Sequence, residues 1–279
     1  MIARADQSPF GSRAPGALDR VVLALTRRVP GNWLGRGLAI LLRRIVTMRH
    51  GEAFDVELWG LRLRLHPLDN GCEKNALFTP QMYDVAERAA LADAIDRRLA
   101  AGGTFTFVDI GANVGLYSLF AATRAGPRAR ILAIEPQPGI LDRLRFNLAL
   151  NVLPLAVSDN EGAVALRIDP NDSGGTRIVR GAIAGEAGTV AVPCRPLLQI
   201  LNDAGISEID ALKIDIEGAE DLALVPFLRD APESLFPAVV LIEDTRGFWR
   251  TDVFALLAQH GYTVFARSRH NLALRRGQA

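Results

Sequence analysis

The sequence has only two cysteines, Cys72 and Cys194, in 279 residues. They form neither a metal-binding spacing nor a disulfide framework, and this usage is typical of a reducing compartment. No apolar run reaches the roughly 18 residues of a transmembrane helix, and residues 1–30 lack the pattern of a secretion signal. We therefore expect a cytoplasmic protein.

Lysine is also scarce, since Lys74 and Lys213 are the only two among 32 basic residues. The formal net charge of +1 creates no strong basic field, so we expect no nucleic-acid partner. The charge is unevenly distributed, however, because residues 1–50 carry nine arginines against two aspartates. Such a basic segment can contact an anionic surface.

Apolar periodicity predicts two amphipathic helices, at 18–29 and 33–48, followed by a β-hairpin over 53–65. Together they predict a helical and hairpin N-terminal extension over residues 1–75. We expect the hairpin, with a later loop at 169–188, to shape the pocket of a substrate.

The second of these helices places Arg36, Arg43 and Arg44 beside an apolar face. This arrangement is typical of a helix that lies on a membrane surface. It equally suits a helix packed on its own domain, which is the interpretation we favour. Peripheral membrane contact through residues 18–48 stays open as the alternative.

The segment 107–118 reads FVDIGANVGLYS, which predicts a buried strand, a tight glycine turn and a helix. Gly111 and Gly115 have no Cβ, so a ligand can approach the backbone closely. We expect free N–H groups at the helix start to face that ligand. The turn lacks the G-x-G-x-x-G spacing of pyrophosphate sites, and no lysine follows it, which excludes a Walker-type phosphate site.

Strands and helices then alternate, which predicts a parallel sheet covered on both faces. The strands of this alternation are expected at 104–110, 130–134, 153–157, 211–216 and 238–242. Residues 160–192 break the alternation, with antiparallel strands expected at 163–168 and 189–192, and a hairpin of 262–267 and 271–274 is expected to close the sheet. Helices are expected at 80–101, 115–124, 139–150, 196–204 and 252–259, and a turn at 69–71.

Acidic residues stand at the ends of four of these strands: Asp109, Glu135, Asp215 with Glu217, and Glu243. In an open α/β sheet these ends share one edge, where ligands bind. An acid at the position of Glu135 can accept both hydroxyls of a ribose. We therefore expect this edge to bind a nucleoside that carries no phosphate groups.

The segment 213–220 reads KIDIEGAE and forms a second dense site. On a strand, Lys213, Asp215 and Glu217 point the same way, and a cation between two acids fixes their geometry. A purely structural ion pair at a strand end is the alternative.

These segments resemble the FkbM family of S-adenosylmethionine-dependent methyltransferases. The resemblance rests on VDIGANVG at 108–115, IEP at 134–136, AVSD at 156–159 and IDALKIDIEGAE at 209–220. It implies a class I methyltransferase domain over 76–279, with a Rossmann-like α/β fold. The expected sheet has seven strands and is mostly parallel, with an antiparallel last strand.

The resemblance also implies S-adenosylmethionine as the cofactor and a small-molecule hydroxyl acceptor on a sugar, glycolipid or polyketide-like metabolite. The residues implied for the cofactor are Asp109, Gly111, Ala112, Asn113 and Gly115 around the methionine part and the turn, Glu135 at the ribose, and Ser158 and Asp159 near the adenine. Asp215 and Glu217 would face the methyl group and the acceptor.

We expect Asp215 or Glu217 to accept the hydroxyl proton, with Lys213 orienting the base and Glu243 as a further candidate. A divalent cation held by Asp215, Glu217 and Glu243 is conceivable, but no clustered ligand motif requires one, and we predict no metal. Two other functions stay open, an NAD-dependent oxidoreductase on the same sheet and a non-catalytic, membrane-associated binding protein.

Overall fold

The structure is a computed structural model that describes residues 8–49, 53–148, 152–170, 172–182, 185 and 188–277. The chain divides into two compact units. The N-terminal unit comprises Met1–Val85 and Asp169–Gly174, and the sheet unit comprises Ala86–Ile168 and Gly175–Ala279. Among the described residues, no helix combines the length and the apolar character needed to span a bilayer.

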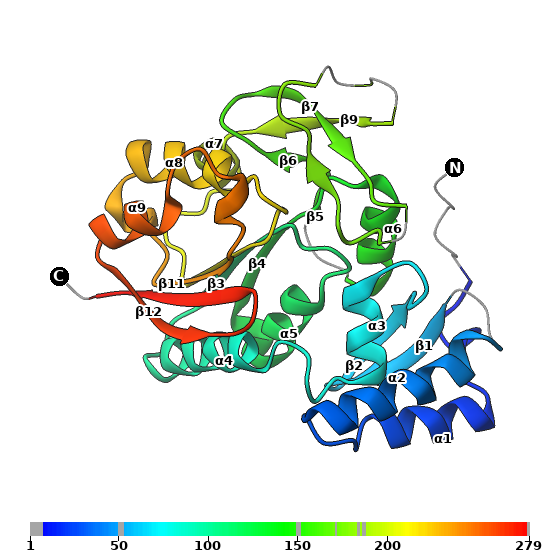
Figure 1. Cartoon of the computed structure of the whole chain (residues 1–279). Helices are drawn as coiled ribbons and strands as arrows, with labels where there is room; N and C mark the ends of the chain where they lie inside the picture. Colours follow the sequence, from blue (N-terminus) through cyan, green and yellow to red (C-terminus); the bar gives the residue numbers. More distant parts are fainter. Residues whose placement is uncertain are drawn as a thin grey trace. The chain divides into compact units, whose positions relative to one another are not determined.

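The sheet unit contains a seven-stranded sheet in the order β12-β13-β11-β10-β3-β4-β5 (Figure 1). Its strands are β3 (Phe105–Ile110), β4 (Ala129–Ile134), β5 (Val152–Leu153), β10 (Ala211–Ile214), β11 (Val239–Glu243), β12 (Tyr262–Arg267) and β13 (Asn271–Arg276). The last strand, β13, lies between β11 and β12 and is antiparallel to both, while the strands from β11 to β5 are parallel. The expected Rossmann-like α/β fold is confirmed.

Helices cover both faces of this sheet. They are α4 (Val85–Ala100), α5 (Leu116–Ala125), α6 (Pro138–Asn147), α7 (Leu197–Asp203), α8 (Glu220–Asp230) and α9 (Val253–Gln259). The predicted helix at 139–150 corresponds to α6, and residues 149 and 150 lie outside the described part of the chain.

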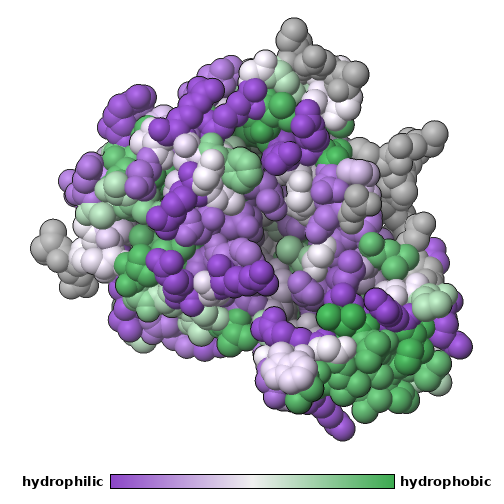
Figure 2. All heavy atoms as spheres, viewed as in Figure 1, coloured by the Kyte–Doolittle hydropathy of each residue, from purple (hydrophilic) through white to green (hydrophobic). Residues whose placement is uncertain are grey.

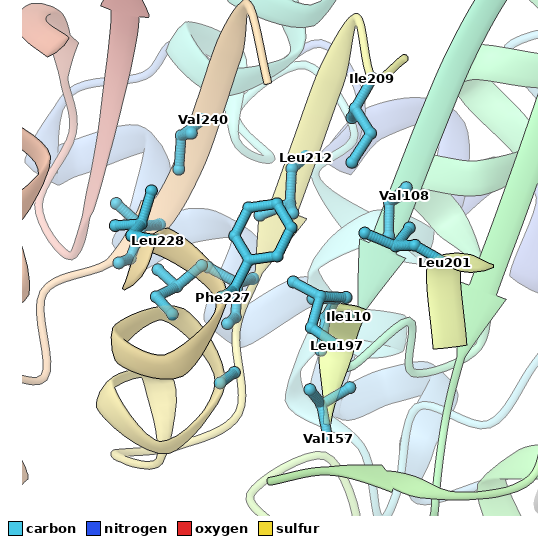
Figure 3. Packing of buried hydrophobic residues seen from close by; sticks show 14 of the residues in the cluster. Val108, Ile110, Val157, Leu197, Leu201, Ile209, Leu212, Phe227, Leu228 and Val240 are labelled. Atoms are coloured by element: carbon cyan, nitrogen blue, oxygen red, sulfur yellow. The ribbon is translucent and has the colours of Figure 1, made fainter. Parts of the chain in front are cut away.

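Strand alternation decides which helices each side chain meets. Val108 and Ile110 of β3 pack in one core cluster with α7, α8 and α9, as Figure 3 shows for Leu197 and Phe227. Phe105 and Phe107 pack in the other cluster, with α4 and α5. Asp109 has the same parity as these two phenylalanines, so its side chain is directed toward α5.

The predicted strand at 153–157 is wrong as a single strand. Val152–Leu153 forms β5 beside β4, and Ala156–Val157 forms β6 in a separate sheet of order β6-β9-β7-β8. Pro154 lies between them and has no N–H to donate to a ladder, which explains the break. The other strands of this sheet are β7 (Gly162–Arg167), β8 (Arg177–Ile178) and β9 (Val190–Arg195).

The N-terminal unit contains the two predicted helices and the predicted hairpin. Its elements are α1 (Ala17–Thr26), α2 (Trp33–Thr47), β1 (Phe54–Leu58), β2 (Leu61–Leu65) and α3 (Gly71–Phe78). The predicted turn at 69–71 leads directly into α3: residue 69 lies in a turn, the Asn70 side chain accepts a hydrogen bond from the Glu73 backbone and caps the helix, and Gly71 is its first residue. Residue 75, the expected boundary of the extension, lies inside α3.

A buried arginine holds the hairpin together. Arg64 of β2 donates to both carboxylate oxygens of Asp55 on β1, at 2.7 and 2.8 Å, and both side chains are almost fully buried. Burial by itself would raise the pKa of Asp55, but Arg64 and the backbone N–H groups of Arg13 and Gly11 outweigh it and leave that pKa lowered. The carboxylate is therefore ionised and fully paired.

The packing expected for α2 accounts for only part of its surface. Gly35, Ala39 and Val46 are buried. A long apolar stripe of the same helix is exposed, and Figure 2 shows hydrophobic side chains gathered over α1 and α2.

We expect Arg64→Met to lower the free energy of unfolding by about 3–5 kcal/mol, because it leaves the Asp55 carboxylate buried without its cation. Arg62→Met, two residues away on the same strand, is the matched control. Its side chain is 74 % exposed, so we expect a loss below about 1 kcal/mol. Urea denaturation of both variants makes the comparison, and equal losses would contradict the role of the buried pair.

Candidate active site

The glycine turn after β3 is shaped by its contact with the segment that follows β10. Gly111 has a φ of +74°, and a Cβ on it would lie 2.0 Å from the carbonyl oxygen of Asp215. The Asp215 N–H also donates to the Ile110 carbonyl at 3.1 Å. Glycine is therefore required at position 111 so that the two strand ends can meet. Close approach of a ligand stays a prediction.

Glycine is needed at position 115 for a similar reason. Its φ is +84°, and an added Cβ would lie 2.4 Å from a methyl carbon of Leu144 on α6. Asn113 between the two glycines is also left-handed, with a φ of 50°, a conformation that asparagine tolerates better than most residues. The turn thus closes tightly onto α6.

The N–H groups of the turn itself, at 111–115, are paired within the protein, and free N–H groups at the start of the following helix stay a prediction. Gly111 and Ala112 both donate to the Ile134 carbonyl at 3.0 Å, and Gly115 donates to the Ala112 carbonyl at 2.9 Å. Asn113 donates to Glu135 at 2.9 Å, and Val114 donates to the Asn113 side chain at 2.9 Å. Because the protein itself satisfies these donors, they are not left over for a phosphate group.

Asp109 is completely buried beneath the turn. Its Oδ2 accepts a hydrogen bond from Ser118 Oγ at 2.7 Å, while its buried Oδ1 has no partner among the described residues. Burial raises the pKa of this carboxyl, against Lys213 and Ser118, which favour its ionised form. The sequence analysis did not single out Ser118. Its position in the first turn of α5, directly after β3, was the available signal, because that turn lies next to the end of the strand that carries Asp109.

Glu135 braces the turn from β4. Its two carboxylate oxygens accept the N–H groups of Asn113 and Gln137, each at 2.9 Å. Burial raises the pKa of Glu135 to about 7, and these two N–H groups oppose that shift. Each oxygen keeps a further lone pair, so the carboxylate can still accept hydroxyl groups.

Lys213 connects this turn with the second motif. It lies opposite Asp109 in the parallel register of β3 and β10. Its Nζ lies 3.0 Å from Asp215 Oδ2 and 5.0 Å from the ring centre of Tyr117, the second residue of α5. The pairing of Lys213 with Asp215 agrees with the K-x-D spacing, whereas the proximity of the same buried ammonium to Asp109 was not predicted from the sequence. Tyr117 was not singled out from the sequence.

Lys213, Asp215 and Glu217 were expected to point the same way on one strand, and this is wrong for Glu217. β10 ends at Ile214, and Glu217 lies in a turn with a φ of 54°. Non-glycine residues in this region are strained, and such strain is found more often at functional sites.

The turn nevertheless brings the predicted acids together. One carboxylate oxygen each from Asp215, Glu217 and Glu243 lies within 4.8 Å of the others. A single divalent cation could bind all three. Burial, followed by the charges of Asp215 and Glu217, raises the pKa of Glu243 to about 8, so near neutral pH this carboxyl is mostly protonated.

Glu220, the last residue of the motif, has a positioning role that the sequence did not reveal. It is fully buried at the start of α8. Its Oε1 accepts the N–H groups of Ile216 and Gly218, and its Oε2 accepts Trp249 Nε1 at 2.7 Å. Glu220 thus holds the turn that carries Glu217 against the segment after β11.

Ser158 and Asp159 lie at the end of β6, in the smaller sheet. Ser158 is buried, and its Oγ lies 3.2 Å from Oδ1 of the exposed Asp159. Its N–H donates to Arg195 of β9 at 3.1 Å. A role of this pair near an adenine stays a prediction.

Residues 109–264 match the methyltransferase FkbM domain. The match covers more than half of the chain. The chain belongs to the FkbM methyltransferase family. This membership favours methyl transfer over both alternatives, the NAD-dependent oxidoreductase and the non-catalytic binding protein.

Two curated proteins are similar to this chain. Methyltransferase sdnD of Sordaria araneosa is 32 % identical over 191 residues, which cover 56 % of this chain and 73 % of that protein. The AMB antimetabolite synthetase AmbE of Pseudomonas aeruginosa is 32 % identical over 204 residues, which cover 57 % of this chain and 10 % of AmbE.

Solved structures similar to this FkbM methyltransferase are distant. A precorrin-6y C5,15-methyltransferase from Geobacter metallireducens is 18 % identical with a TM-score of 0.38, over 72 % of this chain and 89 % of that one. A methyltransferase from Pyrococcus furiosus is 16 % identical with a TM-score of 0.39, over 88 % of this chain and all of that one.

We expect Gly111→Ala to destabilise this FkbM methyltransferase more than Gly102→Ala does. Gly102 has nearly the same φ, +79°, but an added Cβ there meets nothing within 4 Å. The control therefore measures the left-handed backbone alone, about 1–2 kcal/mol. At Gly111 the overlap with the Asp215 carbonyl adds about 1–3 kcal/mol.

Chemical denaturation of the two variants measures this difference. If both lose the same free energy of unfolding, the contact between the turn and Asp215 does not constrain position 111.

Proposed function

We propose that this protein is an S-adenosylmethionine-dependent O-methyltransferase whose acceptor is a hydroxyl on a sugar, glycolipid or polyketide-like metabolite. The observation that carries this proposal is the cluster of Asp215, Glu217 and Glu243, placed directly beside the glycine turn. A glycine turn that holds the methyl donor, with carboxylates beside it, suits methylation of a group that must lose a proton.

The residues of the turn fit this cofactor. The pairing of the N–H groups at 111–115 within the protein suits a nucleoside sulfonium, which has no phosphates. Glu135 would accept the ribose hydroxyls, as its buried carboxylate and spare lone pairs allow. The unpartnered Oδ1 of Asp109 offers a negative site below the turn, near the positively charged methionine part, and Ser158 with Asp159 would lie near the adenine.

When bound, S-adenosylmethionine supplies a methyl group already activated by its positively charged sulfur. The protein therefore has to orient the acceptor hydroxyl in line with that methyl group and accept the hydroxyl proton. As the new C–O bond forms and the C–S bond breaks, the proton passes to the carboxylate of Asp215 or Glu217.

Lys213 and Glu243 support that base. The ion pair at 3.0 Å between Lys213 and Asp215 holds the Asp215 carboxylate in one orientation. Glu243 is mostly neutral near pH 7, because burial and the two neighbouring carboxylates raise its pKa to about 8. The cluster thus avoids a third negative charge while it keeps a basic carboxylate for the acceptor.

We expect Asp215→Asn and Glu217→Gln together to lower kcat by about 10²–10⁴-fold, the usual contribution of a general base. The assay measures transfer of labelled methyl from S-adenosylmethionine to a panel of sugars, glycolipids and polyketide-like alcohols, with amine and carbon acceptors tested beside them. Asp244→Asn is the matched control, because Asp244 also follows a strand of this sheet, the neighbouring β11, but pairs with Arg246 instead.

Three outcomes separate the parts of this proposal. Full turnover by the double variant would reject the two carboxylates as the base and leave the methyltransferase assignment intact. Methyl transfer to an amine or carbon acceptor in place of a hydroxyl would reject O-methylation. Loss of activity with a chelator, restored by a divalent cation, would assign the three carboxylates to a metal and contradict the metal-free prediction.

We expect binding of S-adenosylhomocysteine to weaken as the pH falls below about 7, by up to tenfold per pH unit, because Glu135 loses its charge there. Binding weakens toward low pH because hydroxyl groups donate best to an ionised carboxylate, and Glu135 is protonated below its raised pKa. Calorimetric titration from pH 6 to pH 8 measures the slope. Glu135→Gln should bind more weakly with a flat profile, and an unchanged slope in that variant would exclude Glu135 as its source.

A further inference from the structure

The helices α1 and α2 carry a continuous apolar surface that the N-terminal unit leaves exposed. The residues of this apolar face are Leu18, Val21, Leu25, Trp33, Leu34, Leu38, Leu41, Ile45 and Met48. On α2 they recur at intervals of three and four residues, so they form one stripe along the helix. Figure 2 shows this hydrophobic patch as the largest one on the visible side.

The buried side of α2 is a different one. Gly35, Ala39 and Val46 pack within the unit, whereas Leu41 is 61 % exposed, Trp33 79 % and Met48 85 %. Burial of such side chains in a core is favourable, and a contiguous exposed patch of this kind marks an interaction surface.

The charge beside the apolar face is of one sign. Within the described residues 8–49 there are eight arginines, and the only acid is Asp19. Asp19 is buried, and it accepts the Gly16 N–H at the start of α1. Arg28, Arg44 and Arg49 are exposed and stand next to the ends of the two helices or beside the stripe. The surface formed by the described residues 8–49 is therefore apolar in its centre and basic at its border, and these residues expose no acid.

We propose that the α1–α2 face docks on the surface of an anionic phospholipid bilayer, with both helices lying along the interface. The apolar stripe enters the boundary between headgroups and acyl chains, and the arginines pair with anionic headgroups. Trp33, at the start of α2, is of the residue type enriched at that depth. This inference does not depend on the reaction proposed above.

A second copy of the chain fits this face less well. A two-fold symmetric contact places the same face of both copies against each other, so the arginines of one copy would lie close to the equally basic face of the other. No exposed acid among residues 8–49 is available to neutralise that charge. An anionic lipid surface supplies the missing negative charge.

The test is cosedimentation of the full chain with vesicles of phosphatidylcholine, with and without phosphatidylglycerol. We expect binding to the anionic vesicles, weakened by salt, and at least tenfold weaker binding to pure phosphatidylcholine. Leu41→Glu should reduce binding to the anionic vesicles at least tenfold. Arg44→Gln with Arg49→Gln should reduce it about fivefold for each lost charge.

Val85→Glu is the matched control, because Val85 is a helical residue that is 52 % exposed outside the apolar face. It should bind vesicles as the unchanged protein does. Circular dichroism of each variant, together with binding of S-adenosylhomocysteine, distinguishes loss of docking from loss of folding.

Three results would overturn the proposal. The first is an unchanged protein that fails to bind anionic vesicles, and the second is a folded Leu41→Glu variant that binds as well as the unchanged protein. The third is a concentration-dependent dimer in light scattering without vesicles that Leu41→Glu abolishes, which would assign the face to self-association.

Discussion

The approach of the Gly111 backbone to the Asp215 carbonyl is the constraint on which the site depends. Two strand ends can lie this close only where one of them has no side chain, and Gly111 meets that condition with a left-handed backbone. The same approach sets the register in which Lys213 faces Asp109. The glycine turn and the acidic segment after β10 are therefore two sides of one contact, although about a hundred residues separate them in the chain.

Lys213 is the electrostatic centre of this arrangement. Burial disfavours the charged forms of Asp109, Glu135 and Glu243, and the single ammonium of Lys213 offsets part of that cost for each of them. Glu135 and Glu243 have their pKa raised into the neutral range, to about 7 and about 8. The site therefore limits its own negative charge by holding protons, and proton uptake and release near neutral pH become available to the chemistry of a methyltransferase.

The N-terminal unit combines a buried ion pair with an exposed apolar surface. Its hairpin has two strands, which alone are marginally stable, and the buried pair of Arg64 and Asp55 ties them together. Its two helices meanwhile leave much of their apolar surface uncovered. An exposed apolar patch of this kind marks an interaction surface, which is the basis of the proposed docking on a bilayer.

Much of the fold follows from local sequence, because strand alternation, helical periodicity and glycine turns act over a few residues. The sequence by itself determined the order of the strands and helices, the antiparallel last strand through its family resemblance, and the acids at the strand ends. Only the tertiary structure decided that Pro154 divides one expected strand between two sheets, that Glu220 holds the turn of Glu217, and that the donors of the glycine turn are already paired. These features depend on contacts between residues distant in the chain, which no local pattern encodes. The tertiary structure also decided that the apolar stripe of α2 is exposed, because a helical pattern shows that a face is apolar but not what covers it.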